Sequence, residues 1–132
     1  MKPLRPLVLA LIWAGCSAPT DDALEHLNHK NREVRVRAAE SLGGSGDLRA
    51  VEPLIRAVSD DAAVVRRAAI DALVALGDSQ AVTVLLDALR DPEPYVQYGA
   101  IVGLGRFEDI RAVEPLLGIL DQTNANLGFA AA

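Results

Sequence analysis

Aromatic residues are scarce in this sequence: Phe, Trp and Tyr make up only 4% of a chain in which 51% of residues are hydrophobic. The apolar content is therefore mostly Ala, Val and Leu. This mix suits closely packed helices, whereas a sheet-rich domain of this size would usually carry more Tyr, Phe, Ile and Thr in alternating runs. For a chain of 132 residues we expect one domain with an all-α fold.

Cysteine and basic residues are also in short supply. The single cysteine, Cys16, excludes an internal disulfide and any multi-cysteine metal site. Thirteen Lys and Arg residues stand against 18 Asp and Glu residues, which gives a formal net charge of −5 at pH 7. A surface of this sign repels a phosphate backbone, so nucleic acid is not expected as a partner.

The first 15 residues have the pattern of a secretory signal peptide. Lys2 and Arg5 make the start positive, residues 7–13 form a short apolar run, and small Ala14 and Gly15 follow. The run is too short for an ordinary transmembrane helix. We therefore expect residues 1–15 to be a signal peptide and residues 16–22 to be a short linker.

The segment Trp13-Ala14-Gly15-Cys16 resembles a bacterial lipobox, although that family prefers Leu, Val or Ile where Trp13 stands. The resemblance implies that Cys16 carries a lipid and that the protein contacts the membrane through it. The alternative is simple secretion with an unmodified thiol. Ser17 stands where Asp would signal inner-membrane retention. The resemblance therefore implies an exported lipoprotein of the bacterial envelope, in the outer membrane if the organism is Gram-negative.

The rest of the sequence repeats. Three stretches that begin at Val34, Val65 and Val96 align without gaps at a spacing of 31 residues. The columns that agree include Leu42, Leu73 and Leu104; Val51, Val82 and Val113; Leu54, Leu85 and Leu116; and Asp47, Asp78 and Asp109. Each unit has two apolar stripes at three- and four-residue spacing, which predicts two amphipathic helices. The recurring aspartates stand where the second helix needs an N-cap.

This register divides the chain into a half-repeat and successive full units. The half-repeat covers 23–33, full repeats cover 34–64, 65–95 and 96–126, and a further repeat starts at 127–132. Stacked in order, these units predict an α-solenoid of antiparallel helix pairs over residues 23–132. Its last apolar face would have no polar cap, so we expect either missing downstream residues or a partner that covers it.

The repeat unit resembles bacterial HEAT-like repeats, including those of phycobilisome lyases. The shared pattern is V-R-x-x-A-A-x-A-L-x-x-x-G-D-x-x-A-V-x-x-L-L-x-A-L-x-D. The resemblance implies a HEAT-like solenoid, a fold that serves adaptors, assembly factors and some enzymes.

Residues suited to catalysis are few. His26 and His29 lie three residues apart beside Glu25, but no third metal ligand is near, so they are interpreted as a solvated helix face without metal or cofactor. The HEAT-repeat di-iron hydroxylases rely on His-Glu dipeptides, which this chain lacks. A bilin-lyase-like activity disagrees with a secretion signal. We therefore expect no enzyme; the alternative is a HEAT-repeat enzyme, or a fragment of one, of the bilin-lyase or metal-dependent hydroxylase type.

Two further patterns are interpreted as structural. The GGSG segment at 43–46 lacks a following Lys-Ser or Lys-Thr, so it is expected to shorten a helix and not to bind phosphate. Arg35 and Arg66 share a column with Gln97, and Asp60 aligns with Asp91. These columns predict a ladder of charge-assisted hydrogen bonds between adjacent units.

The predicted function is a non-catalytic scaffold or adaptor that binds another protein or a peptide. The second helices are expected to line the concave side, and their outward positions to form a mixed-charge groove. Tyr95 and Tyr98 break the consensus and are candidate anchors; the alternative is that Tyr98 packs over Gly99. The candidate partner-binding residues are Glu52, Arg56, Thr83, Asp87, Tyr95, Tyr98, Arg111 and Glu114.

Overall fold

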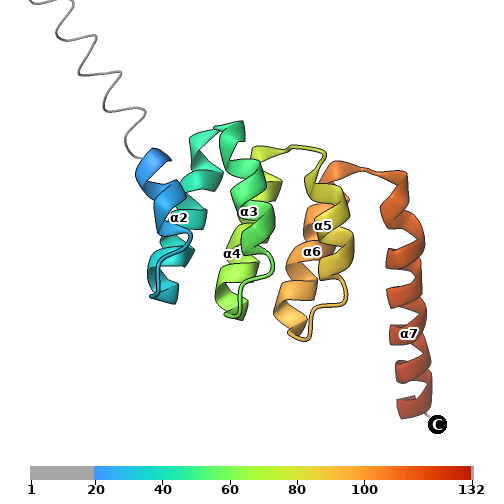
Figure 1. Ribbon diagram of the computed structural model, residues 1–132. Coiled ribbons are helices and arrows are strands. Elements are labelled where there is room, and N and C mark those ends of the chain that lie inside the picture. The colour runs from blue at the N-terminus through green and yellow to red at the C-terminus, as the bar shows by residue number, and fades with distance from the viewer. Residues whose placement is uncertain (1–19, 132) are drawn as a thin grey trace, which may run out of the picture.

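The computed structural model describes the backbone of residues 20–131 and the side chains of residues 20–122. Within this part of the chain every regular element is a helix, which confirms the all-α prediction. Residues 20–26 are helical and precede the elements labelled in Figure 1. Those elements are α2 (Arg32–Ser45), η1 (Leu48–Ala50), α3 (Val51–Ala57), α4 (Ala63–Leu76), α5 (Ala81–Ala88), α6 (Pro94–Phe107), η2 (Ile110–Ala112) and α7 (Val113–Ala131).

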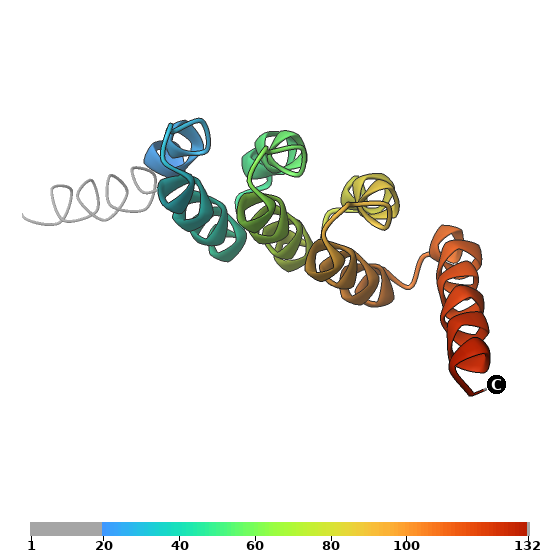
Figure 2. The same cartoon turned by 90° about the horizontal axis from the view of Figure 1, so that it is seen from below.

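The helices stack in two layers, as Figure 2 shows. The first-helix layer consists of α2, α4 and α6, which lie side by side in chain order. The second-helix layer consists of residues 20–26, α3 and α5, with α7 at its C-terminal end. Each second helix packs on the first helix of the next unit, α3 on α4 and α5 on α6. This arrangement confirms the predicted α-solenoid of stacked helix pairs.

The columns of the sequence repeat form the core. Leu42, Leu73 and Leu104 are at most 1% exposed, and each lies on a first helix facing the second-helix layer. Leu54 and Leu85, at equivalent positions of α3 and α5, are completely buried. Burial of a leucine side chain contributes roughly 2 kcal/mol, so one repeated column stabilises several interfaces at once.

The recurring aspartates cap the start of each second helix, as the sequence predicts. The side chains of Asp47, Asp78 and Asp109 accept hydrogen bonds from the backbone N–H two residues later, at 2.9, 2.9 and 2.8 Å. Asp47 and Asp109 begin the 3-10 turns η1 and η2, and regular helix follows. These caps satisfy amide groups that a helix start would otherwise leave without a partner.

The GGSG segment does not shorten its helix, contrary to the sequence-based interpretation. α2 has 14 residues, the same length as α4 and α6. Gly43 serves close packing instead, because a Cβ there would lie 2.8 Å from the Cα of Ala72, and Gly46 ends the helix with a φ of 69°. Only a residue without a side chain lets α2 approach α4 this closely.

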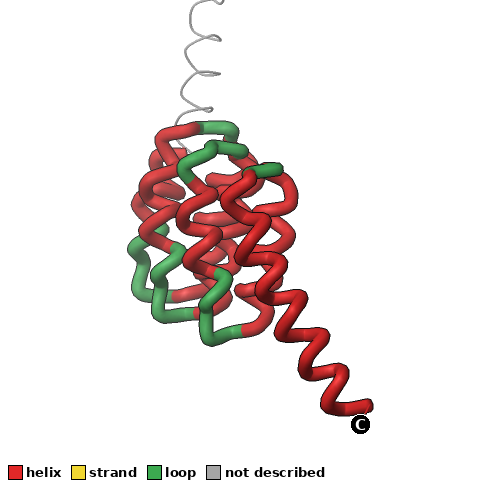
Figure 3. Tube along the Cα trace, turned by 90° about the vertical axis from the view of Figure 1, so that its right-hand side faces the viewer, coloured by secondary structure: helices red, strands yellow, loops and turns green. Residues whose placement is uncertain are grey.

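α7 departs from the repeat. It runs for 19 residues to Ala131, whereas α3 and α5 have 7 and 8. Figure 3 shows it extending beyond the ends of the other helices. The residues that end α3 and α5 are missing here, because Gln122 stands where Asp60 and Asp91 form their turns. The turn expected before a further repeat at 127–132 is therefore absent, and residues 113–131 form one helix.

Candidate functional site

The second-helix layer presents two repeated outward columns. Because Val51 and Leu54 of α3 point into the core, Glu52 and Arg56 on the same helix are exposed. Thr83 and Asp87 take the equivalent places on α5 and are exposed as well. The core columns hold the same residue types from unit to unit, whereas these outward columns change in charge. A surface with a constant frame and variable polar groups is suited to recognising a partner.

The same layer continues through η2 and α7 with Arg111 and Glu114, both exposed. Arg111 is already engaged, however. Its guanidinium donates to the carboxylate of Asp109 at 3.0 and 2.8 Å, and this pairing lowers the pKa of Asp109 to about 2. Arg49 makes the same pair with Asp47 in the first unit. Arg111 therefore stabilises the turn at Asp109 and is a weaker candidate for binding a partner protein.

Two hollows lie along this layer, and the repeat register relates them. The first is lined by Leu27, Asn28, Pro53, Arg56, Ala57 and Asp60. The second is lined by Leu86, Asp87, Leu89, Arg90, Pro115, Gly118, Ile119 and Gln122. Gly118 stands in the column of Arg56, and the empty space grows from about 410 Å³ to about 890 Å³. The lining of the second hollow is thus mostly apolar and includes the charged residues Asp87 and Arg90.

Tyr95 and Tyr98 lie in the other layer, near the start of α6. They are 39% and 61% exposed. Arg67 of α4 bridges them: its guanidinium carbon lies 5.8 Å from the ring centroid of Tyr98, and its Nη1 donates to the Tyr95 carbonyl at 2.7 Å. A Cβ at Gly99 would meet the Arg67 side chain at 2.6 Å, so Arg67 occupies the space over that glycine. The arrangement combines an aromatic ring with a cation.

The eight candidate residues therefore do not form one site. Six of them, Glu52, Arg56, Thr83, Asp87, Arg111 and Glu114, lie on the second-helix layer. Tyr95 and Tyr98 lie on the first-helix layer, which faces the other way (Figure 2). The structure thus separates a mixed-charge surface from an aromatic one.

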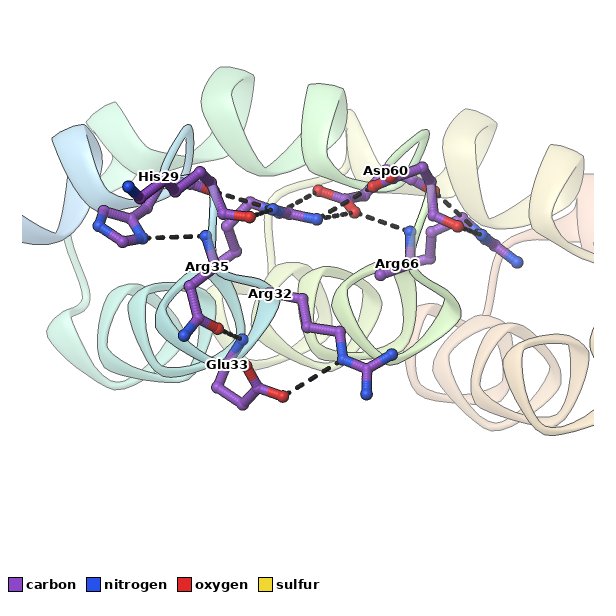
Figure 4. A network of polar contacts seen from close by, with 10 residues as sticks. His29, Arg32, Glu33, Arg35, Asp60 and Arg66 are labelled. Carbon is purple, nitrogen blue, oxygen red and sulfur yellow. Dashed lines mark hydrogen bonds and ion pairs between the residues drawn. The ribbon is translucent and has the colours of Figure 1, made fainter.

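The Arg and Asp columns form the predicted ladder. Arg35 donates from Nε and Nη2 to the two carboxylate oxygens of Asp60 at 2.7 and 2.8 Å, and from Nη1 to the carbonyl of His29 at 2.8 Å. Figure 4 shows Arg35 between these two loops and Arg66 in the next position. The pKa of Asp60 is lowered, although its partial burial opposes the effect of Arg35. The ladder ties one loop to the next and is structural.

Residues 20–131 show neither a metal-binding cluster nor a membrane-spanning helix. No group of three or more His, Cys, Asp or Glu residues there is arranged to hold a metal ion. His26 lies 3.2 Å from the carboxylate of Asp22, and its ring packs edge-on against His29 at 5.9 Å. No helix of this part is long and apolar enough to cross a membrane. The expected signal peptide and the expected lipid site at Cys16 lie outside the described residues.

Sequence reasoning missed two residues of these surfaces. One is Arg67, whose column partner Tyr98 on the neighbouring helix is a signal that the two side chains meet. Gly118 was not considered, although it replaces Arg56 and Asp87 in an otherwise charged column. Comparison of exposed columns between units, and not only of core columns, would have found both.

The comparisons with known proteins agree with this architecture. A family model described as HEAT repeats matches residues 20–94, and one described as PBS lyase HEAT-like repeat matches residues 96–122. No curated protein matches the chain. Among solved structures, the complex of CpcE and CpcF of phycocyanin lyase from Nostoc sp. PCC7120 is similar, with a TM-score of 0.73 and 31% identity. The match covers 77% of this chain but only 42% of that one.

These matches correct one prediction. The sequence led us to expect a protein that is not an enzyme, partly because a secretion signal disagreed with a lyase. That expectation is wrong: the similar solved structure belongs to a phycocyanin lyase, and the repeat over residues 96–122 matches a family named for a lyase. The absence of His-Glu dipeptides argues against a di-iron hydroxylase. It does not argue against a lyase activity that needs no such dipeptide.

Proposed function

The chain belongs to the HEAT-repeat family, and from that premise we propose that it is the part of a lyase-type protein that binds a partner protein. Its task is to hold a partner protein on the second-helix layer while a group is attached or removed. The observation that carries this proposal is the similarity to the phycocyanin lyase complex over 77% of this chain. The match spans only 42% of that chain, so the lyase-type role of the whole protein is part of the proposal.

The surface chemistry supports the choice of layer. Glu52, Arg56, Thr83 and Asp87 are exposed on two adjacent helices whose backbones are fixed by a buried core. A partner therefore meets pre-ordered side chains, so little conformational entropy is lost on binding. Alternating charge at Arg56 and Asp87 favours a partner of complementary pattern and rejects others.

Site-specific photo-crosslinking tests this proposal. A photoreactive amino acid at Thr83 should crosslink to one partner protein in cells, whereas the same group at Arg37, exposed on the first-helix layer, should not. The intact mass of the captured partner is then compared between cells with and without the protein. A covalent group that appears or disappears supports the lyase-type role. Equal crosslinking from both positions would contradict the choice of surface.

We further propose that the protein is exported and held in a bacterial envelope by a lipid on Cys16. Support comes from the sequence alone: Lys2 and Arg5, the apolar run at 7–13, and the lone cysteine after small residues. One acyl chain gives weak membrane binding, so a lipid-modified cysteine with several chains is expected to anchor firmly. Cys16→Ser should release the protein from membranes and abolish the uptake of labelled fatty acid. A wild-type protein that takes up no label would contradict the anchor.

A further inference from the structure

The two hollows of the second-helix layer differ at one column of the repeat. In the first hollow this column holds Arg56, whose side chain forms part of the wall. In the second hollow it holds Gly118 of α7, so the wall has no side chain at this point. A Cβ at Gly118 would meet nothing within 4 Å. Close packing of helices therefore does not account for this glycine, and its effect is to leave the second hollow unfilled.

The second hollow does not lie where a first helix packs. The first hollow has the same place in the repeat, because Pro53 and Arg56 of its lining are equivalent to Pro115 and Gly118. It is open although α3 is packed on α4. A first helix packed on α7 as α4 packs on α3 would therefore leave the second hollow open as well. The hollow is accessible to a molecule that approaches the second-helix layer.

The apolar lining indicates what kind of group fits the second hollow. Leu86 and Leu89 of α5 are half-buried there, and Pro115 of α7 is exposed. Because these side chains border unfilled space, part of their apolar surface stays in contact with water. An apolar group that enters the hollow removes this surface from water, which favours binding. A large side chain such as phenylalanine removes more of it than a small one does.

The charges around the hollow favour a basic residue beside that apolar group. Asp87 of α5 lines the hollow, and Glu114 and Asp121 lie one turn before and one turn after Gly118 on the same face of α7. All three are exposed, and their carboxylates make no hydrogen bond or ion pair with another described residue. The lining contributes one cation, Arg90. The excess of negative charge attracts a basic residue.

We propose that the second hollow receives a large apolar side chain, next to a basic residue, from the protein that binds the second-helix layer. The inference rests on the proposed function and deepens it, because it names the side chains by which that partner is recognised. Gly118 determines specificity, since any side chain there would occupy the space that the partner fills. A partner with alanine or an acidic residue at these two positions is rejected.

Three short peptides test this chemistry. The probe is acetyl-Gly-Lys-Phe-Gly-amide, which is titrated into the full chain and followed by two-dimensional amide NMR. The amide signals of Leu89 and Gly118 should shift and reach saturation. A second peptide has alanine in place of phenylalanine, and a third has glutamate in place of lysine. Each should bind at least about tenfold more weakly, because one loses the apolar contact and the other adds a negative charge.

Gly118→Leu should weaken binding of the probe by about tenfold or more, because the leucine occupies the hollow. The fold should tolerate it, since a Cβ there meets nothing within 4 Å and leucine favours a helix over glycine. Gly44→Leu is the matched control. Gly44 is exposed on α2, and a Cβ there also meets nothing within 4 Å, so this variant should bind as wild type. Thermal unfolding verifies that both variants are folded.

A second variant tests the charge. Asp87→Asn should reduce the preference for lysine over glutamate and keep the preference for phenylalanine over alanine. It removes a carboxylate from the lining and leaves the apolar walls in place. An unchanged preference for lysine would contradict the role of Asp87.

Three results would overturn the proposal. One is no saturable binding of the probe, or equal binding of the three peptides. Another is a Gly118→Leu protein that binds the probe as wild type does. The third is a dimer of the full chain in light scattering that Gly118→Leu dissociates, which would assign the hollow to a second copy.

The partner captured through Thr83 separates this inference from the proposed function. If Gly118→Leu leaves the affinity of that partner unchanged, the second-helix layer remains the binding surface and only the assignment of the hollow is wrong. If the probe binds at Gly118 but Thr83 captures no protein, the proposed function is contradicted and the chemistry of the hollow stands.

Discussion

Arg66 of α4 holds Asp91, in the loop after α5, by two charge-assisted hydrogen bonds: Nε to Oδ2 at 2.8 Å and Nη2 to Oδ1 at 2.9 Å. Its Nη1 also donates to the carbonyl of Asp60 at 3.0 Å. One guanidinium therefore ties the loop before its own helix to the loop of the next unit. In the third unit Gln97 keeps only the bond to the carbonyl of Asp91, at 2.6 Å.

The first prediction concerns this pair. Arg66→Gln should lower the free energy of unfolding by about 2 kcal/mol, because it leaves the nearly buried Asp91 carboxylate without its cation. The side chains of Arg66 and Asp91 are only 13% and 8% exposed, which limits solvent screening. Urea unfolding followed by circular dichroism measures the change. Arg37→Gln, at an exposed position of α2, is the control and should change stability little. Equal stabilities of the two variants would contradict a structural role for the ladder.

The second prediction concerns acid. Arg66 lowers the pKa of Asp91 below its ordinary value of about 4, and Arg111 lowers that of Asp109 to about 2. A carboxylate with a lowered pKa in the folded protein stabilises it above the unfolded value, and that contribution is lost as pH falls through the folded value. The urea midpoint should therefore decline between about pH 4 and pH 2. Asp91→Asn should make the decline shallower while lowering stability at neutral pH. An unchanged decline would show that this pair does not contribute to acid sensitivity.

The third prediction concerns the end of α6. Glu108 has φ of 49°, in the left-handed region, whereas the equivalent C-cap residues of α2 and α4 are Gly46 and Gly77 with φ of 69° and 71°. Glycine adopts this conformation without the steric cost that a side chain carries. Glu108→Gly should therefore raise the free energy of unfolding by about 0.5–1 kcal/mol. Gly77→Ala, the reverse change, should lower it in the same urea experiment. A less stable Glu108→Gly protein would contradict this assignment of strain.

The fourth prediction concerns the contact between α2 and α4. Gly43→Val should destabilise the protein by about 1–3 kcal/mol, because its Cβ would lie 2.8 Å from the Ala72 Cα and push the two helices apart. A Cβ at Gly44, the next residue, meets nothing within 4 Å. Gly44→Ala should therefore leave stability unchanged or raise it by up to about 1 kcal/mol. Thermal unfolding compares the two, and similar behaviour of both variants would contradict close packing at Gly43.

The stacking and the capping of the repeats could be predicted from the sequence, because each depends on a local pattern that recurs. Val, Leu and Ala columns fix which face of each helix is buried, and Asp at one column fixes where a turn begins. The fate of GGSG was not predictable in this way. Gly43 is fixed by its distance to Ala72 on another helix, and no local rule reports that distance.

The length of α7 and the grouping of the candidate residues into surfaces were harder to predict from the sequence. α7 continues past the expected turn because Gln122 lacks the capping carboxylate of Asp60 and Asp91. This one changed residue removes the turn that the repeat predicts. Tyr95 and Tyr98 were grouped with Arg56 and Asp87 because all are exposed. Whether exposed residues share a surface depends on the layer that carries them, which only the packing of α4 against α6 reveals.

The central claim is that the second-helix layer binds a partner protein. The most direct test reverses the charges of two side chains on this layer while the net charge of the protein stays the same. The affinity of the partner crosslinked through Thr83 is measured for wild type and for the pair Arg56→Glu with Asp87→Lys. A second pair, Arg37→Glu with Glu40→Lys, makes the same exchange at exposed positions of the first-helix layer. The account predicts that the first pair weakens binding by about tenfold or more and that the second pair binds as wild type. Undiminished binding by the first pair, or equal weakening by both, would contradict it.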